Sequence, residues 1–237
     1  MQETQFYAVI VAGGNGSRMQ SATPKQFMVI NGLPILMHTL LKFGINKYQP
    51  KIILVLAEEH ITIWENLIKQ FAFDLSHSVV IGGKERFYSV KNSLHLIPEN
   101  AIVAIHDGVR PLLSDDLISA CYQTALEKSN AVCAVQSKDS VRLVENDLEN
   151  RILPRNLVFL VQTPQVFKIA QLKKAYDLDY SQKFTDDSSV VQTAGFPINL
   201  IAGETNNIKI THPLDLRIAE ILLQKNAALF RTASFFK

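Results

Sequence analysis

A buried strand that runs directly into a glycine-rich loop constrains the fold of this chain more than any other feature. Residues 9–12 are apolar, and the loop Gly-Gly-Asn-Gly-Ser-Arg-Met follows at 13–19 without a break. Because glycine has no Cβ, the backbone N–H groups of such a loop can approach and bind an anion. Arg18 and Lys25 add full positive charges nearby. The pattern predicts the first strand–loop unit of an open α/β sheet that binds a polyphosphate.

Other phosphate and nucleophile motifs do not fit this loop. No G-x-x-x-x-G-K-[ST] sequence is present, so the loop is not a P-loop. Gly14 and Gly16 match a dinucleotide fingerprint, but Met19 stands where its third glycine belongs. The chain also has no G-x-S-x-G or H-E-x-x-H motif. An in-line displacement at phosphorus needs no enzyme nucleophile, which favours phosphoryl or nucleotidyl transfer.

Composition limits the classes of partner. The 237 residues are 47% hydrophobic with a net charge of +2, which fits one domain over residues 1–237 and argues against broad nucleic-acid binding. Cys121 and Cys133 lie in apolar surroundings without metal-ligand spacing, so we expect two reduced core thiols. No apolar run is long enough for a membrane span, and the N-terminus lacks a signal-peptide pattern. We expect a cytoplasmic protein.

Short apolar runs alternate with helix-like segments along most of the chain. Strands that are apolar on both faces and separated by helices indicate a mostly parallel sheet covered on both sides. The predicted strands are 6–12, 52–57, 78–81, 101–105, 131–135, 198–202 and 208–210. The predicted helices are 34–43, 58–71, 85–96, 114–128, with Ser114 as N-cap, 169–176, 187–193 and 213–224.

This rhythm breaks after Ser137. Residues 139–167 alternate between apolar and polar side chains around a polar turn at 145–150, which predicts a β-hairpin arm over approximately 138–160. An apolar arm of this size is seldom stable alone in water, so we expect it to pack against a second copy of the chain.

Polar and charged residues follow several of the predicted strands. Asp107 and Arg110 follow one strand, and the segment 82–86, with Ser89 one turn later, follows another. Ligands of open α/β sheets bind at the carboxyl ends of strands, so these groups should converge with the glycine loop. Asp107 fits either a turn cap or a Mg²⁺ ligand, because Mg²⁺ needs few protein carboxylates. The neighbouring His106 is interpreted as structural.

Further polar groups are set among the apolar runs of the second half. Each one alone is more often a cap, a turn or a surface group, but together they could bind a phosphorylated polyol. They are Ser140, Arg155, residues 162–165, residues 185–188 and residues 206–211.

Taken in order, these motifs resemble the cytidylyltransferases that make nucleotide-activated polyols, over nearly the whole chain. The methylerythritol-phosphate group is the most similar. The resemblance depends on residues 12–19, 24–26, 82–86, 106–111, 162–165, 185–187 and 207–211. It implies a Rossmann-like fold of the nucleotide-diphospho-sugar transferase type, a homodimer with interlocking arms, and Mg²⁺-dependent CMP transfer from CTP to 2-C-methyl-D-erythritol 4-phosphate.

The resemblance also implies a role for individual positions. Arg18, Lys25 and Lys209 would be catalytic, and Asp107 would hold Mg²⁺. The nucleotide would contact Ala12, Gly13, Gly14, Gly16, Gly83 and Ser89. The acceptor would contact Arg110, Thr163 and Thr185, with Ser140 and Arg155 supplied by the partner's arm.

The chain departs from the common pattern of these enzymes at a few positions, which are Val11, Gly13, Lys84 and Ser140. Enzymes that transfer CMP to ribitol 5-phosphate share most of the motifs, so that acceptor is an alternative. A noncatalytic nucleotide sensor on the same scaffold is a third hypothesis. Such a sensor would be expected to lose Arg18, Lys25, Asp107 or Lys209, and the chain has all four.

Overall fold

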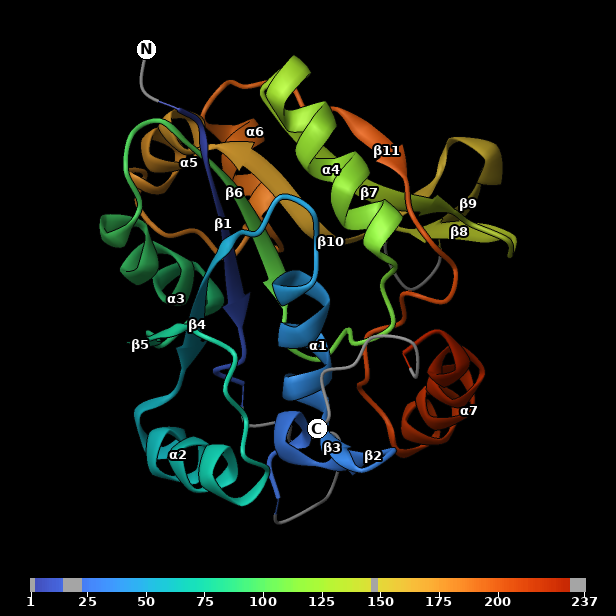
Figure 1. Ribbon diagram of the computed structural model, residues 1–237. Coiled ribbons are helices and arrows are strands. Elements are labelled where there is room, and N and C mark those ends of the chain that lie inside the picture. The colour runs from blue at the N-terminus through green and yellow to red at the C-terminus, as the bar shows by residue number, and fades with distance from the viewer. Residues whose placement is uncertain (1–2, 15–22, 146–148, 231–237) are drawn as a thin grey trace.

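A single seven-stranded sheet forms the centre of the molecule (Figure 1). The computed structural model describes residues 3–14, 23–145 and 149–230, the side chains of 225–230 excepted. In spatial order the strands are β11 (Leu200–Ala202), β7 (Asn130–Gln136), β10 (Phe159–Lys168), β6 (Ala101–Asp107), β1 (Gln5–Val11), β4 (Lys51–Leu56) and β5 (Ser78–Ile81). All pairings are parallel except those of β10, which runs antiparallel to both neighbours. The predicted mostly parallel α/β fold is confirmed.

Helices cover both faces of this sheet, which explains why its strands are apolar throughout. Helices α1 (Ile35–Gly44), α2 (Ile61–Gln70) and α4 (Asp115–Lys128) share one hydrophobic cluster with Ala8 and Ile10 of β1. Side chains alternate across a strand, so Tyr7 and Val9 point to the opposite face. There they pack with α3 (Arg86–Ser93), α5 (Ile169–Tyr176) and α6 (Asp187–Thr193).

A smaller cluster joins the C-terminal helix to the body of the chain. Helix α7 (Pro213–Phe230) contributes Ala219 and Leu223, which pack with Ile30 of β2 (Val29–Ile30). Strand β2 pairs with β3 (Leu33–Pro34). Four short 3₁₀ helices complete the described elements: η2 (Lys25–Phe27), η3 (Glu58–His60), η4 (Leu94–Leu96) and η5 (Arg155–Leu157).

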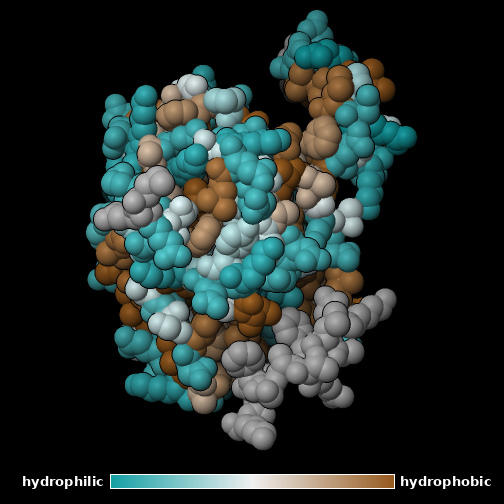
Figure 2. All heavy atoms as spheres, turned by 45° about the horizontal axis from the view of Figure 1, so that its top comes forward, coloured by the Kyte–Doolittle hydropathy of each residue, from teal (hydrophilic) through white to brown (hydrophobic). Residues whose placement is uncertain are grey.

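A two-stranded hairpin projects from the edge of this body (Figures 1 and 2). It consists of β8 (Val141–Val144) and β9 (Asn150–Leu153), which pair antiparallel with each other. Both strands lie within the range predicted for the arm. The alternating pattern that continues to residue 167, however, belongs to β10, a central strand of the main sheet. Its first three residues are exposed and the next six are buried, so local periodicity did not separate arm from core.

Three predicted elements differ from the structure in type or continuity. Residues 208–210 form no strand; Ile210 instead donates its N–H to the Val109 carbonyl at 3.0 Å and is buried in the cluster with α7. The apolar pattern at residues 208–210 therefore reflects packing against α7 and not pairing in a sheet. The predicted helix at 85–96 divides into α3 and η4, and the predicted helix at 58–71 divides into η3 and α2. By contrast, the Ser114 cap is confirmed, because its Oγ accepts the N–H of Leu117 at 3.0 Å.

Cys121 and Cys133 are buried and carry free thiols, as expected. Among the described residues, no helix combines the length and the apolar character that a membrane crossing requires.

Candidate active site

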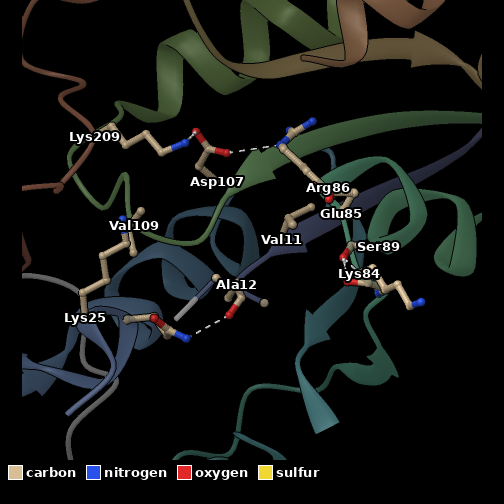
Figure 3. A pocket seen from close by; sticks show the side chains of 14 residues that line it. Val11, Ala12, Lys25, Lys84, Glu85, Arg86, Ser89, Asp107, Val109 and Lys209 are labelled. Atoms are coloured by element: carbon tan, nitrogen blue, oxygen red, sulfur yellow. Dashed lines mark hydrogen bonds and ion pairs between the residues drawn. The ribbon is translucent and has the colours of Figure 1, made fainter. Parts of the chain in front are cut away.

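A cavity of about 230 Å³ opens at the carboxyl ends of β1 and β6 (Figure 3). Its walls come from the loop after β1, from η2, from the turn between β5 and α3, and from the segment before α7. The lining residues are Val11, Ala12, Gly13, Gly14, Lys25, Gln26, Gly83, Lys84, Glu85, Arg86, Ser89, Asp107, Val109 and Lys209. The predicted convergence of these separate stretches is therefore observed.

The start of the glycine loop is held by backbone and side-chain hydrogen bonds. The Ala12 N–H donates to the Val55 carbonyl at 2.9 Å, and the Ala12 carbonyl accepts Nε2 of the buried Gln26 at 2.9 Å. Gln26 directly follows Lys25 in η2, so this bond ties the lysine's short helix to the loop. Gly16 and Arg18 lie outside the described residues.

The turn after β5 requires glycine for a steric reason. A Cβ on Gly83 would lie 2.3 Å from Cβ of Tyr88, which is far below van der Waals contact. The Gly83 N–H donates to Oγ of Ser89 at 3.1 Å, and Ser89 is buried in α3. Ser89 thus holds the turn in place and lines the cavity with the same side chain.

Three cations surround the carboxylate of Asp107 at the end of β6. Lys209 Nζ lies 3.1 Å and Arg110 Nε 3.2 Å from Oδ2, whereas Arg86 Nε lies 3.7 Å from Oδ1. Burial of Asp107 disfavours its charged form, but the attraction of Arg86, Lys209 and Arg110 outweighs burial. The pKa of Asp107 therefore lies well below its usual value, and the group is a carboxylate at any physiological pH.

Arg86 was part of a quoted motif, but sequence reasoning gave it no role. Its Nη1 and Nη2 each donate to one oxygen of Asp187 at 2.7 Å. Gln26 was missed in the same way. Gln26 adjoins Lys25, and Arg86 lies between Gly83 and Ser89, yet the partners of Gln26 and Arg86 are distant in sequence, and no local signal identifies those partners.

The predicted acceptor residues divide into two groups. Arg110 and Thr163 both contact Asp107: Arg110 Nε donates to its carboxylate, and Oγ1 of the buried Thr163 accepts the Asp107 N–H at 3.1 Å. Thr185 is exposed, just before the residue that caps α6. None of the three is among the described residues that line the cavity.

Ser140 and Arg155 lie on the arm side of the molecule and are exposed. Arg155 donates to the Lys138 carbonyl at 3.1 Å and lines a separate cavity of about 670 Å³ at the base of the arm. Within one subunit, neither side chain is among the described residues that line the cavity at Asp107.

His106 matches its structural interpretation. It is fully buried, its Nε2 lies 3.2 Å from the Arg110 carbonyl oxygen, and burial lowers its pKa to about 3. A neutral imidazole in this position supports the loop that carries Arg110.

Cations, a carboxylate and a glycine-lined backbone at the ends of parallel strands define the class, which is a nucleotidyltransferase of the α/β type. The model of the 2-C-methyl-D-erythritol 4-phosphate cytidylyltransferase family matches residues 6–225. The chain belongs to this family.

Individual relatives agree with the family match. The enzyme of that name from Porphyromonas gingivalis strain W83 is 44% identical over 222 residues, covering 93% of this chain and 99% of the relative. That of Bacteroides fragilis is 44% identical, with 91% and 98% coverage. The crystal structure of 4-diphosphocytidyl-2C-methyl-D-erythritolsynthase from Anaerococcus prevotii superposes with a TM-score of 0.80 at 27% identity, covering 93% and 99% of the two chains.

These similarities confirm the predicted family and reaction class. The chain is an enzyme, a cytidylyltransferase of the non-mevalonate route to isoprenoid precursors. They do not favour the ribitol-phosphate or the sensor alternative.

Proposed function

We propose that this chain transfers CMP from CTP to 2-C-methyl-D-erythritol 4-phosphate, with Mg²⁺, as a cytoplasmic homodimer, using the residues assigned below. One observation carries the proposal. Lys25, Asp107 and Lys209 come from three separate segments and line the same cavity as the glycine loop. That combination supplies two cations and one carboxylate around a backbone that can bind phosphates.

The nucleotide end of the cavity suits a base and a triphosphate. Ala12, Gly13, Gly83 and Ser89 would bind cytosine, because they present backbone groups and one hydroxyl where side chains do not obstruct approach. Gly14 and Gly16 would let the loop approach the triphosphate closely. Lys25, together with Arg18, would bind the phosphate oxygens on which charge builds during transfer.

The acceptor would enter beside Asp107. Lys209 and Arg110 would bind its phosphate, and Thr163 would keep the Asp107 backbone in place through the observed hydrogen bond. Thr185 remains a predicted contact. An oxygen of the acceptor phosphate then attacks the α-phosphorus of CTP in line. The bond from that phosphorus to the β-phosphate oxygen breaks, and pyrophosphate leaves with both electrons of the bond.

The carboxylate of Asp107 fits Mg²⁺ as a single protein ligand. Its Oδ2 lies 3.1 Å from Lys209 Nζ and 3.2 Å from Arg110 Nε, whereas Arg86 Nε lies 3.7 Å from Oδ1, beyond hydrogen-bond distance. Within the described ranges no group of three or more His, Cys, Asp or Glu could hold a metal. Mg²⁺ often binds through one carboxylate and substrate phosphates. Bound there, it would neutralise charge on the triphosphate.

The arm supports a homodimer with shared sites. Apolar side chains on and beside the hairpin are exposed, namely Leu143, Val144, Ile152, Leu157, Phe159, Leu160 and Val161. Figure 2 shows brown, hydrophobic atoms on this projection. A patch of this kind fits burial against a second copy, which would bring Ser140 and Arg155 to the partner's acceptor site.

The direct test is incubation of the purified protein with CTP, Mg²⁺ and methylerythritol phosphate, with pyrophosphate release as the readout. Ribitol 5-phosphate serves as the matched acceptor control. Release with methylerythritol phosphate at much higher kcat/KM supports the proposal. Equal or greater turnover of ribitol phosphate would refute the acceptor assignment, and absence of turnover by folded protein would refute the activity.

A further inference from the structure

An ion pair between Arg86, which lines the cavity, and the buried Asp187 takes no part in the proposed transfer steps. Asp187, the first residue of α6, is fully buried. Its Oδ1 accepts Nη1 of Arg86 at 2.7 Å and the Tyr176 hydroxyl at 2.6 Å, and its Oδ2 accepts Nη2 of Arg86 at 2.7 Å. Two parallel bonds between a planar guanidinium and a carboxylate fix the orientation of both groups.

This clamp determines how Arg86 faces Asp107. With both terminal nitrogens bonded to Asp187, Nε is the nitrogen that lies toward Asp107, 3.7 Å from Oδ1 (Figure 3). Lys209 and Arg110 contact the other oxygen at 3.1 and 3.2 Å. The two oxygens of Asp107 therefore differ: Oδ2 accepts a hydrogen bond from Arg110 Nε and lies 3.1 Å from Lys209 Nζ, whereas the ion pair between Oδ1 and Arg86, at 3.7 Å, is longer than a hydrogen bond.

The separation matters because a free guanidinium would compete with a metal ion for Oδ1. An arginine binds a carboxylate best through two nitrogens at about 2.7–2.9 Å. Asp187 supplies that partner in the interior, and its negative charge offsets the positive charge of Arg86. Arg86 can then sit beside the site without closing the metal position.

We propose that Asp187 is a positioning residue of the transferase: by clamping Arg86, it keeps the guanidinium off Oδ1 of Asp107 and so leaves that oxygen available to a divalent cation. The inference rests on the proposed role of Asp107 as the Mg²⁺ ligand. A pair with a purely structural role would instead join α3 to α6 without affecting metal dependence.

The central experiment measures the Mg²⁺ concentration that half-saturates CTP binding, by calorimetry without acceptor, and the same quantity in the activity assay. Asp187→Asn leaves Arg86 without its charged partner, so the guanidinium turns to Asp107. We expect the half-saturating concentration to rise about tenfold, because the guanidinium then competes with the metal for Oδ1; this corresponds to about 1.4 kcal/mol of apparent binding free energy. The double variant Arg86→Gln/Asp187→Asn removes the competing cation and should return to within about threefold of the wild type.

Two further variants distinguish a change in metal dependence from a general loss of folding. Arg86→Lys cannot form the two-bonded clamp, so it should shift the metal requirement in the same direction as Asp187→Asn. Tyr176→Phe removes a hydrogen bond to the same buried carboxylate but leaves the clamp, and serves as the matched control, with metal dependence within about twofold of the wild type.

The outcomes separate the two proposals. Wild-type metal dependence in both Asp187→Asn and Arg86→Lys overturns the inference while the transferase assignment stands. So does a double variant that is shifted as far as Asp187→Asn, or an equal shift in Tyr176→Phe. If the wild type binds CTP without any metal dependence, the assignment of Asp107 fails and the inference fails with it.

Discussion

The cavity and the arm are built in opposite ways. In the cavity, the Asp107 side chain is 10% exposed and contacts three cations from three different segments. In the arm, β8 and β9 pair with each other, and Val144 and Ile152 expose about two thirds of their surface, 66% and 65%. The cavity is thus organised within one subunit, whereas the arm presents an apolar surface that its own chain leaves uncovered.

The difference teaches which part of the enzyme depends on assembly. A carboxylate among cations keeps its geometry because the Asp107 side chain is only 10% exposed, so its contacts are less screened than those of surface charges. A two-stranded hairpin has too little apolar contact to be independently stable in water. We therefore expect changes in the cavity to act in the subunit that carries them, and changes in the arm to act through the second subunit.

The largest effect should follow Lys25→Ala. Loss of a cation from the developing phosphate charge should lower kcat about 10²–10³-fold, or roughly 3–4 kcal/mol in barrier, by analogy with a single oxyanion-hole donor. Stopped assays of pyrophosphate release measure this, and thermal unfolding should be unchanged. The control is Lys69→Ala on the exposed side of α2. A nucleotide sensor would lose binding affinity alone.

Arg155→Ala examines whether the arm serves the partner. The variant should lose most activity while keeping its fold, since the side chain is exposed. In a statistical mixture with Lys25→Ala, about half of the dimers are heterodimers, and each has one intact shared site, so about a quarter of wild-type activity should return. If confirmed heterodimers recover no activity, each site lies within a single subunit, and the arm does not serve the partner's site.

Ile152→Asp addresses the surface of the arm. Removing a side chain that the dimer buries should weaken association by about 1.5–3 kcal/mol, roughly tenfold to more than a hundredfold in Kd. Sedimentation velocity at several concentrations measures this, and activity should fall with the dimer population. Ile63→Asp, at an exposed apolar position of α2, is the control and should leave association unchanged. If Ile152→Asp and Ile63→Asp dimerise with the same Kd, the arm is not the interface.

The smallest effect is expected for Glu145→Gln. Glu145 Oε1 and Arg151 Nε form an ion pair at 3.0 Å across the hairpin, but the two side chains are 52% and 61% exposed. Exposed pairs contribute about 0–1 kcal/mol, so the free energy of unfolding from urea titration should change by less than about 0.5 kcal/mol, and less still in high salt. A loss well above 1 kcal/mol would mean that a partner subunit buries this pair.

Much of the local structure was predictable because it depends on neighbouring residues. Ser78–Ile81 and Ile169–Tyr176 have the predicted bounds, since period and flanking residues specify them. Strand β10 was not recognised as a core strand. Its exposed start continues the alternation of the arm, and its place between β7 and β6 depends on pairing with residues that lie between 23 (Phe159 and Gln136) and 66 (Lys168 and Ile102) positions away.

The candidate site shows the same difference between features set by neighbouring residues and features set by distant contacts. Lys25, Asp107, Gly83 and Ser89 were identified from motifs, and Lys209 from its resemblance to a family pattern; all five line the cavity. Asp187 was missed as a partner of Arg86, although both residues lay in quoted motifs. They are separated by 101 positions, so their pairing is a property of how α3 and α6 pack, which no short pattern encodes.

By itself, the sequence determined most of the strands and helices, the glycine-rich turns of the site, and the family, because each depends on residues read in succession. The tertiary structure alone decided that three cations surround one carboxylate, that Asp187 holds one of those cations, and that the arm's apolar side chains stay exposed. These outcomes depend on which strand ends become neighbours, and distant segments become neighbours when the sheet buries its two faces.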